Sequence, residues 1–285
     1  MKLFLASLAT YLTFTSATPV RRGGDDTVND MSSVISGSAP CAAVGVLFAR
    51  GTFDSGNIGV WVGPDFNDAL KSNIPSVAVE GVDPTAYPAT LDSYLSEGGS
   101  NSGAQSMAQT AQAYVQKCPN AALVIAGWSQ GALVAHKALD QLDDATRGKV
   151  AGLVTFGDPW HLFSDETPSV TTQGYCVTGT VFDPLCANLP SDFKLPTSVD
   201  DIVGPFKDLP SAVQGWEQTK AAASLVEQFP GELSDAWDGF VQNLQQGGIQ
   251  RAMLTPQHFT YGNNGMASQA AQYIAGLDMV KAAQA

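Results

Sequence analysis

Short apolar runs alternate with longer amphipathic segments along most of the chain after residue 41. Five runs rich in Val, Leu, Ile or Phe and ended by Gly, Asp or Pro predict strands at 42–48, 76–82, 122–126, 150–156 and 173–178. Helical spacing of apolar residues predicts helices at 102–117, 132–142 and 267–282. Strands alternating with helices indicate an α/β protein, a three-layer α/β/α sandwich with a mainly parallel central sheet.

The alternation stops at 187–250, where no strand-like run occurs. Apolar residues there recur at helical spacing and predict two amphipathic helices. The first is marked by Val213, Trp216, Ala223 and Val226, and the second by Leu233, Trp237, Phe240, Val241 and Leu244. We interpret the segment as a helical insertion in a domain at 41–285. It either forms a lid over the functional site or packs elsewhere on the sheet.

The first 18 residues have the layout of a secretory signal peptide: a basic start, an apolar run and small residues. The run is shorter than the roughly 20 residues that a membrane-spanning helix needs. Residues 19–40 are then an N-terminal extension or a propeptide, in which Arg21-Arg22 resembles a dibasic processing site. We therefore expect a secreted, extracellular protein that is not an integral membrane protein.

The chain of 285 residues carries 14 basic and 27 acidic residues, a net charge of −13. This charge repels phosphate backbones, so we expect no nucleic-acid partner. We expect a neutral partner and a monomer.

Four cysteines allow three pairings. Cys176 and Cys186 are ten residues apart in a segment with Gly and Pro, so a local disulfide is the simplest pairing and leaves Cys41 with Cys118. The sequence has only three histidines as further candidate metal ligands. We therefore expect no metal site and no cofactor.

The strongest chemical signal is a Gly-x-Ser-x-Gly motif at 127–131, between an apolar strand and a helix. Glycines at 127 and 131 allow a turn so sharp that the serine side chain leaves the sheet edge, and the following helix directs backbone N–H groups at the site. Ser129 is therefore the candidate nucleophile.

A serine nucleophile needs a base and an acid that orients it. His136 lies two turns along the same helix and cannot reach back, and His161 is a weaker alternative at a strand end. His258 precedes the last helix and completes the chain order serine, acid, histidine. For the acid we favour Asp183, which lies between Cys176 and Cys186, over Asp158, whose setting indicates a turn.

Hydrolysis through a serine also needs donors for a developing oxyanion. The backbone N–H after the nucleophile, that of Gln130, is one candidate. Thr52, in Arg50-Gly51-Thr52 after the first strand, is the second, with its N–H and its hydroxyl. A plain turn at Gly51-Thr52 is the alternative.

These motifs resemble those of the cutinase family, secreted serine esterases that include acetylxylan esterases. The similar segments span 41–186 and the chain from residue 257 on, among them 50–52, 56–59, 87–89, 117–119, 127–132 and 156–159. The resemblance implies a Ser129, Asp183, His258 triad, an oxyanion hole from Thr52 and Gln130, and disulfides Cys41–Cys118 and Cys176–Cys186. The sequence differs from the family pattern in the long connection between Asp183 and His258.

We therefore expect a carboxylic-ester hydrolase whose partner is an ester: a cutin-like polyester, a short or medium lipid ester, or an acetylated polysaccharide. Two alternatives remain: a carbohydrate deacetylase like acetylxylan esterase, and a non-catalytic secreted binding protein or elicitor.

Overall fold

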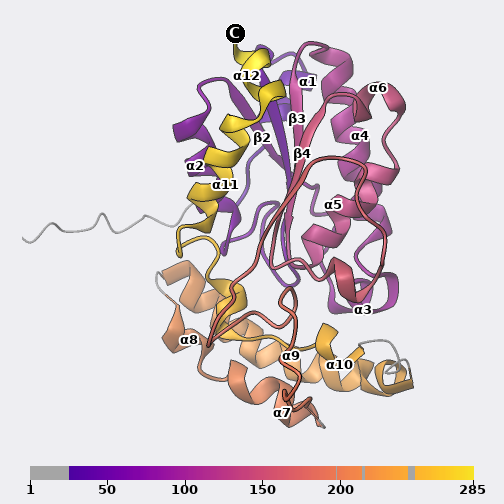
Figure 1. Cartoon of the computed structure of the whole chain (residues 1–285), viewed down its shortest axis with the longest axis vertical. Helices are drawn as coiled ribbons and strands as arrows, with labels where there is room; N and C mark the ends of the chain where they lie inside the picture. The colour runs from indigo at the N-terminus through magenta and orange to yellow at the C-terminus, as the bar shows by residue number, and fades with distance from the viewer. Residues whose placement is uncertain (1–25, 197, 214–215, 243–247) are drawn as a thin grey trace, which may run out of the picture.

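The computed structural model describes residues 26–196, 198–213, 216–242 and 248–285 (Figure 1). The expected signal peptide at 1–18 and the Arg21-Arg22 pair lie outside the described residues. In the described part of the chain, no helix is both long and apolar enough to cross a bilayer.

A five-stranded sheet forms the centre of the molecule, in the order β2-β1-β3-β4-β5 with every neighbouring pair parallel. The strands are β1 (Val44–Ala49), β2 (Val77–Gly81), β3 (Ala122–Trp128), β4 (Val150–Phe156) and β5 (Thr172–Tyr175). Strands β1 and β3 are buried throughout because helices cover both faces of the sheet. Each observed strand overlaps one of the five predicted runs, so the fold class is confirmed.

Helices cover the two faces of the sheet as the alternation of side chains requires (Figure 1). On β1, Val46 and Phe48 join the apolar core beneath α2 (Gly63–Asn73), α11 (Met266–Gly276) and α12 (Asp278–Gln284). Leu47, on the other face, joins the core beneath α4 (Asn101–Lys117) and α5 (Gln130–Asp140). The short α6 (Asp144–Arg147) follows α5, and α3 (Leu91–Glu97) precedes α4.

The expected last helix at 267–282 is two helices, because Leu277 adopts an extended conformation between α11 and α12. The predicted helix at 102–117 starts one residue earlier, where the side chain of Ser100 accepts a hydrogen bond from the Gly103 N–H at 3.0 Å.

The segment before residue 41 packs against the domain that we expected to begin there. Helix α1 (Asp30–Ile35) buries Met31 and Val34 against the α4 side of the sheet. The Ser32 hydroxyl donates to Glu80 at 2.6 Å, on the edge strand β2.

The described part of the 187–250 segment is irregular up to residue 196 and largely helical from residue 199 on, and it lies beyond the carboxyl ends of the strands (Figure 1). It contains α7 (Val199–Val203), η2 (Gly204–Phe206), α8 (Leu209–Ala212), α9 (Trp216–Gln242) and most of α10 (Gly248–Arg251). The two predicted amphipathic helices largely coincide with one helix, α9, which continues through Pro230. Val213, which marked the first of them, lies before α9 in an extended conformation at the end of α8. Buried α9 residues such as Leu233 join the core under α2 and α11. The side chains of Trp216, Trp237, Phe240, Val241 and Leu244 lie outside the described part of the structure.

Candidate active site

Ser129 lies in the turn between β3 and α5, with φ 58° and ψ −125°. Its N–H donates to the Phe156 carbonyl on β4 at 3.0 Å. The turn needs both flanking glycines: a Cβ at Gly127 would collide with the Gly131 carbonyl, and one at Gly131 with the Ala49 carbonyl. The motif therefore forms the sharp elbow that its sequence predicts.

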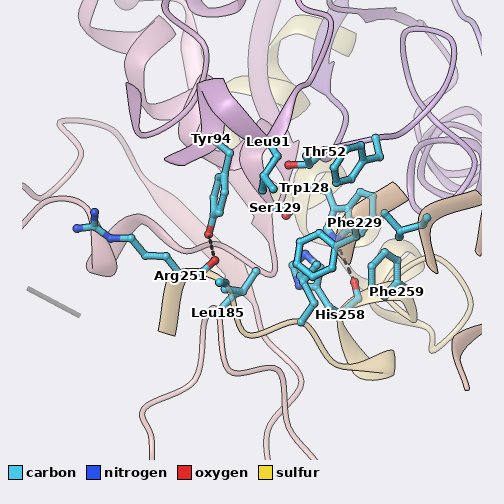
Figure 2. Close-up of a pocket in the computed structure, with 14 residues that line it drawn as sticks. Thr52, Leu91, Tyr94, Trp128, Ser129, Leu185, Phe229, Arg251, His258 and Phe259 are labelled. Atoms are coloured by element: carbon cyan, nitrogen blue, oxygen red, sulfur yellow. Dashed lines mark hydrogen bonds between the residues drawn. The ribbon is translucent and has the colours of Figure 1, made fainter. Parts of the chain in front are cut away.

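Asp183 and His258 are brought together from 75 positions apart, with Asp183 Oδ2 2.7 Å from His258 Nδ1. Both side chains are almost fully buried, at 0% and 1% relative exposure. His258 lies on the short 3₁₀ helix η4 (Pro256–Phe259), and its position is fixed by Trp128, whose indole N–H donates to the His258 carbonyl at 3.0 Å (Figure 2).

The Asp183 carboxylate is held by more than the histidine. The Tyr261 hydroxyl donates to Oδ2 at 2.6 Å, and the Leu185 N–H donates to Oδ1 at 3.0 Å. Burial raises the pKa of Asp183, but the charge of His258 and the hydrogen bonds from His258, Tyr261 and Leu185 outweigh it, so the pKa lies below its usual value. The carboxylate is therefore kept ionised beside the imidazole.

The loop that carries Asp183 is closed by the Cys176–Cys186 disulfide, and a second disulfide joins Cys41 to Cys118. Closing a short loop restricts the positions that the carboxylate can take.

Gly157, at the end of β4, leaves room for the pair. It has φ +52°, and a Cβ there would lie 2.8 Å from both Asp183 Oδ2 and His258 Cε1. Only glycine accommodates this backbone conformation together with such close neighbours.

Ser129 and His258 line one cavity at the carboxyl ends of β1 and β3 (Figure 2). His258 Nε2 is buried and has no hydrogen-bond partner among the described residues. No hydrogen bond joins this nitrogen to Ser129 in the structure, although both residues line the cavity.

Thr52 and Gln130, the expected oxyanion residues, are in contact with each other. The Thr52 hydroxyl donates to Gln130 Oε1 at 3.2 Å, and Gln130 Nε2 donates to the Ser93 hydroxyl at 2.7 Å. These bonds hold the Gln130 side chain at the start of α5. The backbone N–H groups of the first turn of α5 lie beside Ser129.

The cavity is small and apolar, with a volume of about 30 Å³. Its wall comes from the body of the domain and from the insertion together. The lining residues are Thr52, Phe53, Leu91, Tyr94, Trp128, Ser129, Leu185, Leu225, Phe229, Arg251, Ala252, Leu254, His258 and Phe259.

The alternative histidines and the alternative acid lie elsewhere. His136 Nε2 is 2.8 Å from Asp158 Oδ2, and its ring stacks on Trp160 at 4.2 Å between centroids. Asp158 Oδ1 also accepts from the Trp160 N–H at 2.9 Å, the turn arrangement that its sequence indicates. His161 lies in η1 (Trp160–Leu162), and neither it nor His136 lines the cavity.

Sequence reasoning did not assign roles to Tyr261, Gly157, Leu225 or Phe229. Tyr261 follows His258 by three residues, a spacing that places two side chains near one another after a helical turn. Leu225 and Phe229 carry no signal in the sequence beyond helical periodicity. Periodicity identifies the buried face of a helix, but it does not identify the part of the protein against which that face packs.

Comparisons with known proteins agree with the fold and the motifs. The family model described as cutinase matches residues 40–194. A cutinase of Hypocrea jecorina is 40% identical over 163 residues, covering 55% of this chain and 64% of that protein. A cutinase of Coprinopsis cinerea is 42% identical over 155 residues, covering 53% of this chain and 73% of that protein. A solved structure of Trichoderma reesei cutinase with a phosphonate inhibitor is 29% identical, with a TM-score of 0.45, over 72% of this chain and 84% of that chain.

The fold and the site are those of an α/β hydrolase with a serine at a nucleophile elbow. The chain belongs to the cutinase family. It spans about two thirds of the length of the Hypocrea jecorina relative. The family match ends at residue 194, so most of the insertion and His258 lie beyond it.

Proposed function

We propose that this protein is a secreted, monomeric serine carboxylic-ester hydrolase of the cutinase type. The observation that carries the proposal is the buried Asp183–His258 pair at 2.7 Å, with the free His258 Nε2 and Ser129 lining one cavity. The large majority of buried side-chain polar atoms have a hydrogen-bond partner, so an unpartnered ring nitrogen in a cavity with a serine favours a catalytic role.

In the proposed reaction Ser129 Oγ attacks the ester carbonyl while His258 Nε2 takes its proton. The carbonyl oxygen becomes an oxyanion, which the backbone N–H groups of Gln130 and Thr52 stabilise, while the Thr52 hydroxyl donates to Gln130 Oε1. The C–O bond to the alcohol then breaks, and His258 returns the proton to the departing alcohol, which leaves an acyl-enzyme. Water, deprotonated by His258, attacks the acyl-enzyme and releases the carboxylic acid and Ser129.

Asp183 has a supporting role in both steps. It accepts the Nδ1 proton of His258, which holds the imidazole with Nε2 unprotonated in the free enzyme. It also stabilises the imidazolium that forms when the proton moves.

The helical insertion acts as a lid in this proposal. Leu225 and Phe229 of α9 line the cavity, and Gln218 Nε2 on the same helix donates to the Val60 carbonyl at 3.2 Å. A second contact joins α10 to the body of the domain, because the Tyr94 hydroxyl donates to the Arg251 carbonyl at 2.8 Å (Figure 2). The Leu225 and Phe229 side chains narrow the cavity, so their displacement would make room for an acyl chain beside Ser129.

The apolar lining favours short or medium acyl groups, or the acyl part of a cutin-like polyester, as substrates. The test is hydrolysis of p-nitrophenyl esters from acetate to palmitate by the purified protein beside Ser129→Ala. We expect a Ser129-dependent rate with a maximum near butyrate. Hydrolysis of acetate alone would instead favour carbohydrate deacetylation, and no Ser129-dependent hydrolysis of any ester would overturn the proposal.

A further inference from the structure

A groove of about 430 Å³ lies directly beside the cavity, between α9 and the loops at 53–60 and 88–90. Phe53 and Leu225 line both the groove and the cavity. These two side chains therefore form the partition between the space around Ser129 and the groove.

The two compartments differ in polarity because α9 presents different residues to each. Lys220, Ser224 and Gln228 are exposed and line the groove, at the four-residue steps that place side chains on one helix face. Gln228 Nε2 donates to the Ser224 hydroxyl at 2.7 Å, so the two polar groups are adjacent. Leu225 and Phe229, each one position later, line the apolar cavity.

Residues with unusual backbone conformations lie both in the groove and at the elbow. Within the described residues, the non-glycine residues with positive φ are Phe53 at 62°, Ala89 at 56° and Ser129 at 58°. The Phe53 N–H donates to the Ala89 carbonyl at 3.0 Å, and both residues line the groove. Such conformations are unfavourable and gather at functional sites, where the surrounding structure holds them.

We propose that this groove binds the alcohol part of the ester when that part carries hydroxyl groups, while the acyl part occupies the apolar cavity. The inference rests on the proposed function. The ester bond would lie at the Phe53–Leu225 partition, beside Ser129. Lys220, Ser224 and Gln228 supply the hydrogen bonds that neighbouring hydroxyls need, and these occur both in glycerol and in sugar residues.

The test compares butyrate esters that share an acyl group and differ in the alcohol: ethyl butyrate, glycerol monobutyrate and xylose monobutyrate. The variant Ser224→Ala/Gln228→Leu removes two polar groups from the groove. Glu227→Leu, at an exposed α9 position that does not line the groove, is the matched control. We expect kcat/KM for the hydroxylated esters to fall about tenfold or more relative to ethyl butyrate in the variant, because each lost hydrogen bond contributes about 1 kcal/mol. The hydroxylated ester whose kcat/KM falls further in the variant shows whether the groove prefers a glycerol-like or a sugar-like alcohol.

A variant with an unchanged ratio would overturn the inference, as would a wild-type protein that does not prefer the hydroxylated esters. A second measurement does not need catalysis: binding of glycerol monobutyl ether to Ser129→Ala protein, followed by ligand-observed NMR. We expect binding that the groove variant loses and Glu227→Leu keeps. Absence of binding would overturn the inference alone, whereas hydrolysis that does not depend on Ser129 would overturn the proposed function.

Discussion

Tyr261 donates its hydroxyl proton to Asp183 Oδ2 at 2.6 Å, the same oxygen that lies 2.7 Å from His258 Nδ1. One carboxylate oxygen thus has two donors, and both hold it toward the imidazole. The tyrosine is buried, and burial together with the neighbouring charge of Asp183 raises its pKa far above the usual value, so it remains a donor at every working pH.

Tyr261→Phe removes this donor and keeps the ring. We expect kcat/KM to fall about tenfold, in line with a hydrogen bond to a charged group. Because the bond favours the ionised form, its loss raises the pKa of Asp183, and activity should disappear at a higher pH on acidification. The pH profile of kcat/KM measures both effects.

Tyr175→Phe is the matched control for Tyr261→Phe. Its ring stacks on Phe156 with centroids 5.4 Å apart, and the substitution keeps that contact. An unchanged pH profile in Tyr261→Phe would contradict the supporting role of the tyrosine.

Gly157→Ala tests the space beside the pair. The added Cβ would meet Asp183 Oδ2 and His258 Cε1 at 2.8 Å, so we expect kcat to fall about 10²-fold or more because a displaced imidazole misses the serine. Gly179→Ala is the control, since Gly179 also has a positive φ, +119°, but its Cβ would meet nothing within 4 Å. An equal fall in kcat in Gly157→Ala and Gly179→Ala would mean that backbone strain, and not the space beside Asp183 and His258, causes the effect.

Phe229→Ala tests whether α9 limits access to Ser129. The side chain is 1% exposed and lies edge-on to Phe53, with centroids 6.3 Å apart. Its truncation should lower the free energy of unfolding by about 3–5 kcal/mol and enlarge the cavity. We expect the preferred p-nitrophenyl ester to become longer by two or more carbons.

Leu233→Ala is the control for Phe229→Ala, because Leu233 is buried on the same helix and does not line the cavity. It should lower stability while the chain-length preference stays unchanged. The same shift in both variants would mean that loosening α9 anywhere has this effect.

Asp54 predicts a pH dependence of stability. Burial raises its pKa to about 7, against hydrogen bonds from the Val60 and Ser55 N–H groups and the charge of Arg50, which lower it. The ordinary value of 3.8 applies to the unfolded chain. Between these two pH values the folded state binds more protons than the unfolded state, so the free energy of unfolding falls as pH rises, by up to about 1.4 kcal/mol per pH unit.

Asp54→Asn should remove this slope, as measured by urea denaturation between pH 4 and 8. Asp140→Asn, at an exposed position on α5, should leave it unchanged. A slope that persists in Asp54→Asn would show that another group titrates.

The sequence predicts the parts of this molecule whose local pattern is enough. The elbow at Ser129 needs only a strand, two glycines and a helix. Chain order favours His258, and the position between Cys176 and Cys186 favours Asp183 over Asp158. The continuity of α9 is different: Pro230 lacks a backbone donor and favours a helix break, but burial of neighbours such as Phe229 and Leu233 holds the segment as one helix. Likewise, helical periodicity predicts that Leu225 is buried, but it does not predict that Leu225 lines the same cavity as Ser129.

The most direct test of the account is labelling with a fluorophosphonate, followed by peptide mass spectrometry of the intact wild-type protein, Ser129→Ala and His258→Gln. We expect one labelled residue, Ser129, in the wild type and no label in Ser129→Ala. We expect labelling of His258→Gln to be slowed by about 10³-fold or more, because the serine then lacks its base. Rapid labelling of Ser129 in His258→Gln, or no labelling of Ser129 in the wild type, would contradict the proposed mechanism.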